Sequence, residues 1–289
     1  MERSWRAGRV MLAGLMVGAA VLGGCGQGAD RPRSDQLDIT VSILPQKTFV
    51  ERIGGQRVAV NVMVLPGESP ATYEPKPAQL KALSEAEAYV SIGVPFENAW
   101  LEKIASANPD MLMVDTTKGI DRIGGPQNPD PHIWLSPPLV KVQAETIQEA
   151  LAALDPEHAD IYRTNLEAFL AEIDALDAEI RETLDGAEGG RFMVFHPSWR
   201  YFAREYGLEM IPIEVGGQEP SAAELADLIA RAREEGIRVV FAQPEFSTEA
   251  AETIAAEIGG EVLLISPLAE DWSENLLRVA ETLAEAVGP

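Results

Sequence analysis

Two kinds of apolar pattern alternate along this chain of 289 residues. Short continuous apolar runs bounded by polar residues or glycine are typical of buried strands, whereas apolar residues at every third or fourth position are typical of helices. The runs predict strands at residues 37–43, 57–65, 88–93, 111–115, 191–195, 209–214, 237–243 and 261–266. These strands form two groups, one in each half of the chain.

Helical spacing fills most of the segments between the predicted strands. Helices are expected at residues 45–55, 77–87, 96–107, 198–207, 221–236, 247–260 and 272–287. Pro45 suits the first turn of a helix, and Ser221 with Glu224 three residues later has the pattern of a capping box. Because strands and helices alternate, each group of strands is expected to form a parallel sheet flanked by helices.

The segment between the two groups has a different pattern. Residues 156–184 contain no glycine and no internal proline, and their helical spacing predicts one helix of about 40 Å. The predicted fold is therefore α/β, with two lobes of mainly parallel sheet joined by one long backbone helix. The N-terminal lobe is expected at 37–154, the connecting helix at 155–186 and the C-terminal lobe at 187–289. His158 lies among charged residues in the first turn of this helix and is interpreted as a solvated surface residue.

The N-terminal segment has the features of an export signal. Three arginines, an apolar run from Val10 to Leu22 and the sequence LGGC, which ends at Cys25, resemble a bacterial lipoprotein signal. We expect a signal peptide at 1–24, a polar tether at 25–36, and a lipid on Cys25 that anchors the exported protein to a membrane. The mature protein then faces the periplasm or the cell exterior, and which membrane holds the anchor stays open. An ordinary signal peptide with a chance cysteine is the alternative.

Composition and motifs narrow the classes of function. The net charge of −23 provides no basic surface, so nucleic acid is not an expected partner. Cys25 is the only cysteine, which leaves none for a disulfide or a thiolate metal site after lipidation. The sequence has no Gly-x-Ser-x-Gly, His-Glu-x-x-His or phosphate-loop motif. A binding protein is therefore favoured over an enzyme.

Two histidines lie in loops that follow predicted strands. Ligands of open α/β sheets bind beyond the carboxyl ends of the strands, where four such loops gather. The loops are residues 67–75, 128–137, 195–199 and 265–272. The second carries His132 and the third His196, and imidazole suits zinc well. Two histidines from different lobes can bridge a metal across the cleft, but zinc needs four ligands, or three with water. Structural histidines held by hydrogen bonds are the alternative.

Three motifs carry a resemblance to a known family. The segments DPHIWLSP, FHPSWRYFAREYGL and QPEFSTEAAETIAAEIG resemble those of the metal-binding lipoproteins of zinc and manganese ABC transporters. The resemblance covers nearly the whole mature chain. It implies two lobes joined by a rigid helix, metal binding in the cleft, and delivery of the metal to a permease driven by a separate ATPase. Histidine at position 196 is typical of zinc-type members, whereas manganese-type members usually carry glutamate there.

The chain departs from the family pattern at two expected ligands. The sequence PATYEP places Ala71 where the family has its first histidine ligand, and SPL places Ser266 where it has an acidic ligand. A methyl group has no lone pair, and a neutral hydroxyl is a poor zinc ligand. Glu68, Glu74 and Glu245 lie in nearby loops and are candidate replacements, with solvated carboxylates as the alternative for each.

Three functional hypotheses follow from this pattern. The first is a lipid-anchored, monomeric zinc receptor that uses His132 and His196. The second is a receptor of the same fold that binds another small solute or a metal chelate. The third is an adhesive surface lipoprotein without transport function. The sequence alone leaves the native ligand, its affinity and the identity of the permease open.

Overall fold

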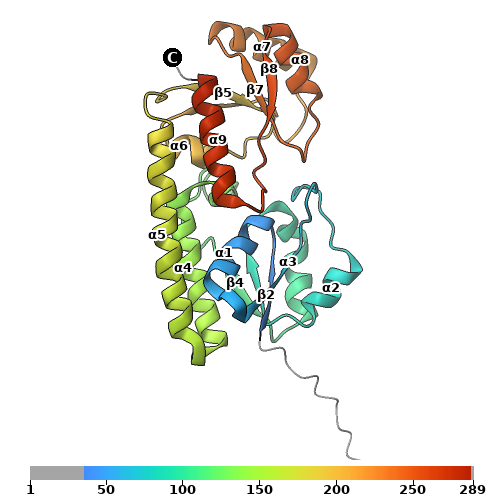
Figure 1. Ribbon diagram of the computed structural model, residues 1–289. Helices are drawn as coiled ribbons and strands as arrows, with labels where there is room; N and C mark the ends of the chain where they lie inside the picture. The colour runs from blue at the N-terminus through green and yellow to red at the C-terminus, as the bar shows by residue number, and fades with distance from the viewer. Residues whose placement is uncertain (1–35, 288–289) are drawn as a thin grey trace, which may run out of the picture. The chain divides into compact units, whose positions relative to one another are not determined.

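Two parallel four-stranded sheets form the framework of the described residues (Figure 1). The computed structural model describes residues 36–287, so the predicted signal peptide and Cys25 lie outside the described residues. The first sheet contains β1 (Leu37–Val41), β2 (Val58–Val62), β3 (Ala88–Ser91) and β4 (Leu112–Asp115). The second contains β5 (Arg191–Val194), β6 (Glu209–Pro212), β7 (Val239–Ala242) and β8 (Glu261–Leu264). Each predicted strand is present but shorter than expected.

The two sheets share one topology. Their strand orders are β2-β1-β3-β4 and β6-β5-β7-β8, and every pairing is parallel, as Val41 with Val62 and Val194 with Phe241 illustrate. In each sheet the chain adds a strand on one side of the first strand and then crosses to the other side. The carboxyl ends of β1 and β3, and of β5 and β7, therefore flank the kind of crevice in which α/β proteins bind ligands. The predicted fold class is confirmed.

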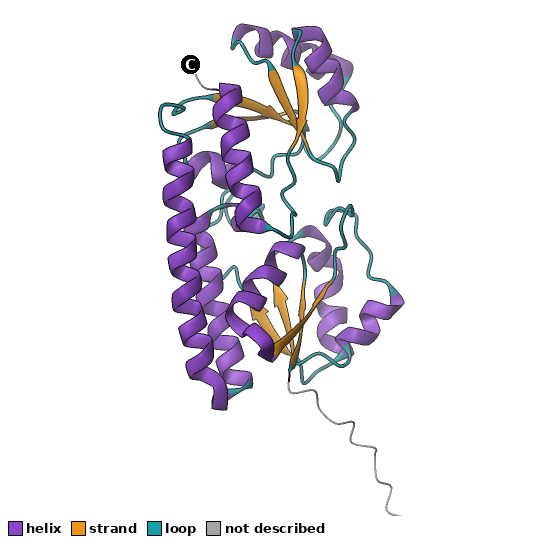
Figure 2. Ribbon diagram, viewed as in Figure 1, coloured by secondary structure: helices purple, strands orange, loops and turns teal. Residues whose placement is uncertain are grey.

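Helices cover these sheets (Figure 2). They are α1 (Leu44–Gly54), α2 (Pro77–Leu83), α3 (Pro95–Ala107), α4 (Pro137–Leu154), α5 (Ala159–Thr183), α6 (Arg200–Glu205), α7 (Ala222–Glu234), α8 (Glu249–Ile258) and α9 (Trp272–Val287). Pro45 lies in the first turn of α1 as predicted. The predicted capping box of α7 is also present: the Ser221 backbone N–H donates to Glu224 Oε2 at 2.8 Å, and the Glu224 N–H donates to Ser221 Oγ at 3.4 Å.

The long connecting helix is α5, and it has a helical partner that the sequence analysis missed. No helix was assigned to residues 137–154, where α4 forms. Two prolines open α4, at positions where a missing N–H costs nothing. Its buried positions then follow helical spacing; they include Val140, Ala144, Ile147 and Leu151. Because α4 packs against both α5 and α1, the long connecting helix α5 is one arm of a helical hairpin whose other arm is α4.

The start of α5 also differs from the prediction. A 3₁₀ turn at Pro156–His158 joins α4 to α5, so the α-helix itself begins at Ala159. His158 is not simply solvated: its Nδ1 lies 2.9 Å from Oδ1 of Asp155, and its side chain is 31% exposed. The limits assigned to the lobes and to the connecting segment stay a prediction.

Three aromatic side chains pack where α1, α5 and α9 meet. The Phe49 ring lies 5.2 Å from Trp272 and 6.0 Å from Phe169, measured between ring centroids. Because α9 also contacts β5 of the second sheet, this cluster connects the helices of the first lobe to the second lobe. Within residues 36–287, no helix combines the length and the apolar character needed to cross a membrane.

Candidate metal-binding site

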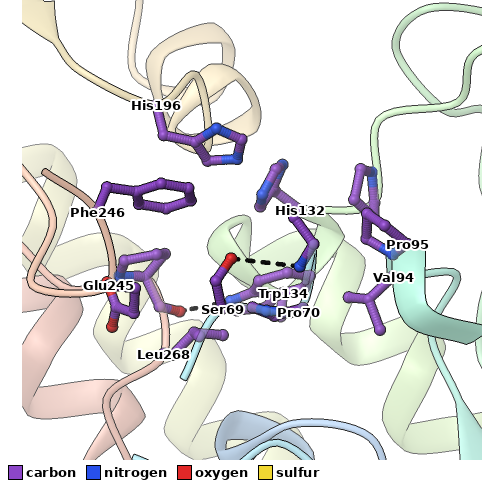
Figure 3. A pocket seen from close by; sticks show the side chains of 13 residues that line it. Ser69, Pro70, Val94, Pro95, His132, Trp134, His196, Glu245, Phe246 and Leu268 are labelled. Carbon is purple, nitrogen blue, oxygen red and sulfur yellow. Dashed lines mark hydrogen bonds between the residues drawn. The ribbon is translucent and has the colours of Figure 1, made fainter. Parts of the chain in front are cut away.

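His132 and His196 lie next to each other, although they are far apart in the sequence. His132 ends the loop after β4, directly before the 3₁₀ turn Ile133–Leu135, and His196 follows β5 by two residues. Their ring centroids are 5.3 Å apart and the rings meet edge to face (Figure 3). The structure therefore brings the two predicted histidines of the two lobes together.

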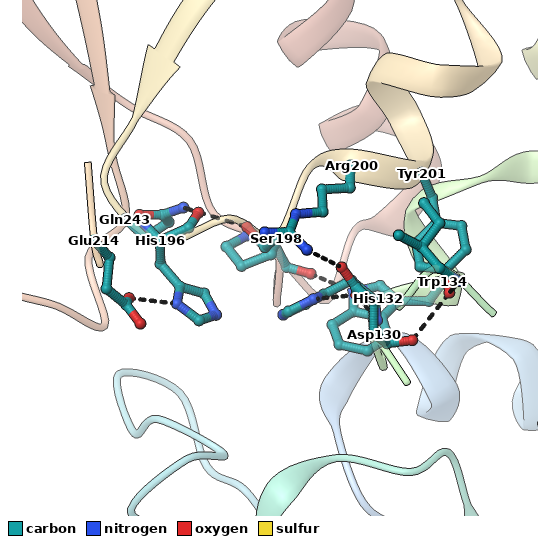
Figure 4. Close-up of polar contacts among 11 residues, drawn as sticks. Asp130, His132, Trp134, His196, Ser198, Arg200, Tyr201, Glu214 and Gln243 are labelled. Carbon is teal, nitrogen blue, oxygen red and sulfur yellow. Dashed lines mark hydrogen bonds and ion pairs between the residues drawn. The ribbon is translucent and has the colours of Figure 1, made fainter. Parts of the chain in front are cut away.

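A buried carboxylate orients His132 (Figure 4). Asp130 Oδ1 lies 2.7 Å from His132 Nδ1 and also accepts the His132 backbone N–H at 2.9 Å. Burial by itself would raise the pKa of Asp130, but the hydrogen bonds and charge of His132 outweigh it and hold this pKa below its usual value. With Nδ1 donating to Asp130, the lone pair of His132 Nε2 is left for another partner.

Burial also determines the charge of His132. It lowers the pKa of the imidazole, and the opposing effect of Asp130 does not cancel it. His132 is therefore neutral near pH 7, which is the form that binds a metal.

His196 has the same type of support. Its Nδ1 lies 2.7 Å from Glu214 Oε2, a residue in the loop after β6. Its backbone is held by the fully buried Gln243: the His196 N–H donates to Gln243 Oε1 at 3.1 Å, and Gln243 Nε2 donates to the His196 carbonyl at 2.7 Å. The His196 ring stacks on Phe246 with centroids 4.5 Å apart. Both the position and the orientation of this imidazole are thus determined by neighbouring groups.

A cavity of about 140 Å³ adjoins the two imidazoles. Proline, aliphatic and aromatic side chains of both lobes form most of its wall. The lining residues are Ser69, Pro70, Ala71, Val94, Pro95, Pro131, His132, Trp134, His196, Glu245, Phe246, Pro267 and Leu268. Trp134 also joins the lobes, because its Nε1 donates to the Pro267 carbonyl at 2.7 Å.

The comparison with known proteins identifies the family. Residues 39–286 match the family described as ZnuA, "Zinc-uptake complex component A periplasmic". This match covers well over half of the chain. The chain belongs to the ZnuA family of metal-binding proteins of zinc and manganese ABC transporters. This is a family of transport receptors and not of enzymes.

Individual relatives agree with this assignment. The high-affinity zinc uptake system protein ZnuA of Bacillus subtilis (strain 168) is 27% identical, over 93% of this chain and 90% of the relative. A crystal structure of a ZnuA deletion mutant with zinc bound is 54% identical, with a TM-score of 0.84 over 88% of this chain and 99% of that chain. The laminin-binding protein Lmb of Streptococcus agalactiae, described as having adhesin and metal transporting activity, is 25% identical, with a TM-score of 0.78 over 87% of this chain and 99% of that chain.

Ala71 and Ser266, the two predicted departures from the family pattern, have different surroundings. Ala71 is exposed and lines the cavity, so a methyl group faces the space beside the imidazoles. Ser266 does not line that cavity. Its hydroxyl donates to Glu245 Oε1 at 2.9 Å and accepts the Leu268 N–H at 3.1 Å.

The three candidate carboxylates have different surroundings. Glu245 lines the cavity, and its Oε2 is buried without a hydrogen-bond partner; burial raises the pKa of this carboxyl. Glu68 pairs with Lys76 at 2.8 Å, and Glu74 is exposed; neither lines the cavity. Among residues 36–287, no three His, Cys, Asp or Glu side chains are grouped closely enough to hold a metal ion.

The sequence analysis missed Asp130, Glu214 and Gln243, which support the two histidines. Asp130 had a local signal, because an aspartate two residues before a histidine can reach its Nδ1. Glu214 and Gln243 lie 18 and 47 residues from His196. No short motif contains such pairs, and only the neighbouring positions of β5, β6 and β7 in the sheet bring them together.

Proposed function

We propose that this chain is the zinc-binding receptor of an ABC importer and that it binds zinc between the lobes through His132 and His196. The observation that carries the proposal is the pair of adjacent imidazoles, each with its Nδ1 on a carboxylate. A carboxylate on Nδ1 leaves Nε2 free to bind a metal. Zinc-binding histidines are usually held in this way. Membership of the ZnuA family agrees with this assignment.

Glu245 is the most suitable third donor among the three predicted carboxylates. It lines the same cavity as the two histidines, and one of its oxygens has no hydrogen-bond partner. Glu68 and Glu74 do not line this cavity. If Glu245 contributes a ligand, Glu245→Gln weakens zinc binding, whereas an unchanged affinity would remove Glu245 from the site.

Calorimetric titration of zinc into the metal-stripped protein tests the proposal. We expect one site with micromolar or tighter affinity, and loss of binding in His196→Ala. The matched control is His158→Ala, because His158 is bound to Asp155 at the start of α5 and does not line the cavity. Equal zinc affinity of the His196 variant and the unmodified protein would contradict the assignment.

The delivery step involves further components. We propose that the receptor acts as a monomer and passes zinc to a permease that a separate ATPase drives. We also propose that a lipid on Cys25 anchors the mature protein to a membrane, on the sequence signal that ends in LGGC. Cys25→Ser is then expected to move the protein from the membrane fraction to the soluble fraction. An unchanged distribution would contradict the anchor.

A further inference from the structure

The candidate site has more room and fewer donors than a bare zinc ion needs. Zinc in proteins takes four donors at about 2.0–2.3 Å. The two imidazoles supply two donors; Glu245 lines the same cavity, but it does not form a metal-binding group of three side chains with them among the described residues. The cavity of about 140 Å³ is well above the roughly 10–15 Å³ that one water molecule needs on the same measure.

The wall beside the imidazoles is apolar at the positions where further donors are missing. Ala71 presents a methyl group, and Val94, Pro95 and Leu268 complete this part of the lining. The Ser266 hydroxyl is already engaged with Glu245 and Leu268. Apart from the two imidazoles, Ser69 and Glu245 are the polar residues of the lining, so the wall offers few protein partners to water molecules that would complete the zinc coordination.

A zinc ion that already carries an organic chelator needs fewer donors from the protein and fills more of the apolar cavity. The chelator supplies the two missing donors, and its carbon skeleton packs against the apolar wall. Two aromatic side chains of the cavity wall pack against the imidazoles: the Trp134 ring lies 5.1 Å from His132, and the Phe246 ring lies 4.5 Å from His196. Aromatic side chains in a cavity wall favour the planar or apolar part of a small ligand.

We infer that the ligand of this cavity is a zinc ion bound to a small bidentate chelator, with His132 and His196 completing the coordination of the metal. This inference rests on the proposed function as a zinc receptor, and it specifies the chemical form in which zinc is bound. The replacement of the family's histidine by Ala71 creates the space that the chelator fills.

Parallel titrations with zinc alone, with an equimolar mixture of zinc and 2,2′-bipyridine, and with bipyridine alone test the inference. We expect the zinc–bipyridine complex to bind at least tenfold more tightly than zinc, with one zinc and one bipyridine retained per protein after gel filtration. Bipyridine alone is expected to bind weakly, because it offers nothing to the two imidazoles.

Two variants of Ala71 distinguish the effect of an added zinc donor from the effect of a smaller cavity. Ala71→His adds a donor and bulk, and we expect it to bind zinc at least tenfold more tightly while it no longer retains bipyridine. Ala71→Leu adds similar bulk without a donor, and we expect weaker binding of the complex with no gain for zinc. Because Ala71 is exposed, both variants are expected to fold, which circular dichroism verifies.

The outcomes distinguish the two proposals. If the unmodified protein binds zinc equally well without bipyridine, or removes zinc from it, the inference is overturned while the zinc receptor stands. If neither zinc nor the complex binds, the proposed function is overturned together with the inference.

Discussion

At the scale of single residues, the two histidines depend on carboxylates that lie behind them. Asp130 and Glu214 each accept a hydrogen bond from an imidazole Nδ1 at 2.7 Å. A carboxylate in this position fixes the tautomer and the ring orientation and makes the other nitrogen a better donor to a metal. In the proposed zinc site, the carboxylates therefore act on the metal through the histidines and are positioning residues.

Replacing Glu214 by glutamine is expected to weaken zinc binding by about 10- to 100-fold, because an uncharged amide holds the His196 tautomer less firmly. Zinc affinity by competition with a chelating dye measures the effect. Glu209→Gln is the matched control, since Glu209 lies on β6, the strand before the loop that carries Glu214, but forms an exposed pair with Arg191. Equal losses of zinc affinity in both variants would indicate a general effect of removing negative charge rather than the loss of the contact between Glu214 and His196.

At the scale of elements, the hairpin of α4 and α5 supports the rest of the fold. A polar cluster closes the turn between the two helices. Asp155 accepts hydrogen bonds from Tyr162 Oη at 2.7 Å and from Arg57 Nη2 at 3.3 Å, and its Oδ1 lies 2.9 Å from His158 Nδ1. The hydrogen bond from His158, followed by that from Tyr162, holds the pKa of Asp155 below its ordinary value against the opposing effect of burial.

The lowered pKa of Asp155 implies a pH-dependent contribution to stability. A carboxyl whose folded pKa is depressed stabilises the fold above its unfolded pKa, which is about 3.9, and loses that contribution as the pH falls through the folded pKa. Asp155→Asn is therefore expected to lower the free energy of unfolding at pH 7 by about 1 kcal/mol. The difference from the unmodified protein should shrink below about pH 4.

Denaturant unfolding at pH 7 and at pH 3 measures this difference. Asp160→Asn serves as the control, because the Asp160 side chain is 85% exposed, whereas that of Asp155 is 15% exposed. A destabilisation by Asp155→Asn that is equally large at both pH values would show that the charge of Asp155 is not its cause.

At the scale of the whole described molecule, the site exists because two lobes of equal topology meet. The loops after β3 and β4 supply Val94 and His132, and the loops after β5 and β7 supply His196 and Glu245. Two indole N–H groups connect Trp134 to the loop after β8 and to helix α9. Trp134 donates to the Pro267 carbonyl, and Trp272 donates to the Trp134 carbonyl, both at 2.7 Å. Trp272 also packs against Phe49 and Phe169, so the cavity wall continues directly into the contact between the lobes.

Much of this arrangement was predictable from the sequence. The eight strands, the long helix α5 and the capping box at Ser221 all follow from local patterns. Strand and helix periods depend on neighbouring residues only, and the carboxyl ends of parallel strands necessarily gather on one side of a sheet. The family resemblance rests on short contiguous motifs for the same reason.

Other features required the tertiary structure. Helix α4 was missed at the sequence level, and the support of His196 by Glu214 and Gln243 joins separate strands. The sequence by itself determined the two-lobed α/β fold and the pair of histidines, and it predicts that Ala71 and Ser266 stand in place of two family ligands. Only the tertiary structure decided that Ala71 faces an apolar cavity while Ser266 is engaged with Glu245. Side-chain direction and pocket shape depend on contacts between residues distant in the chain, and such contacts leave no local pattern.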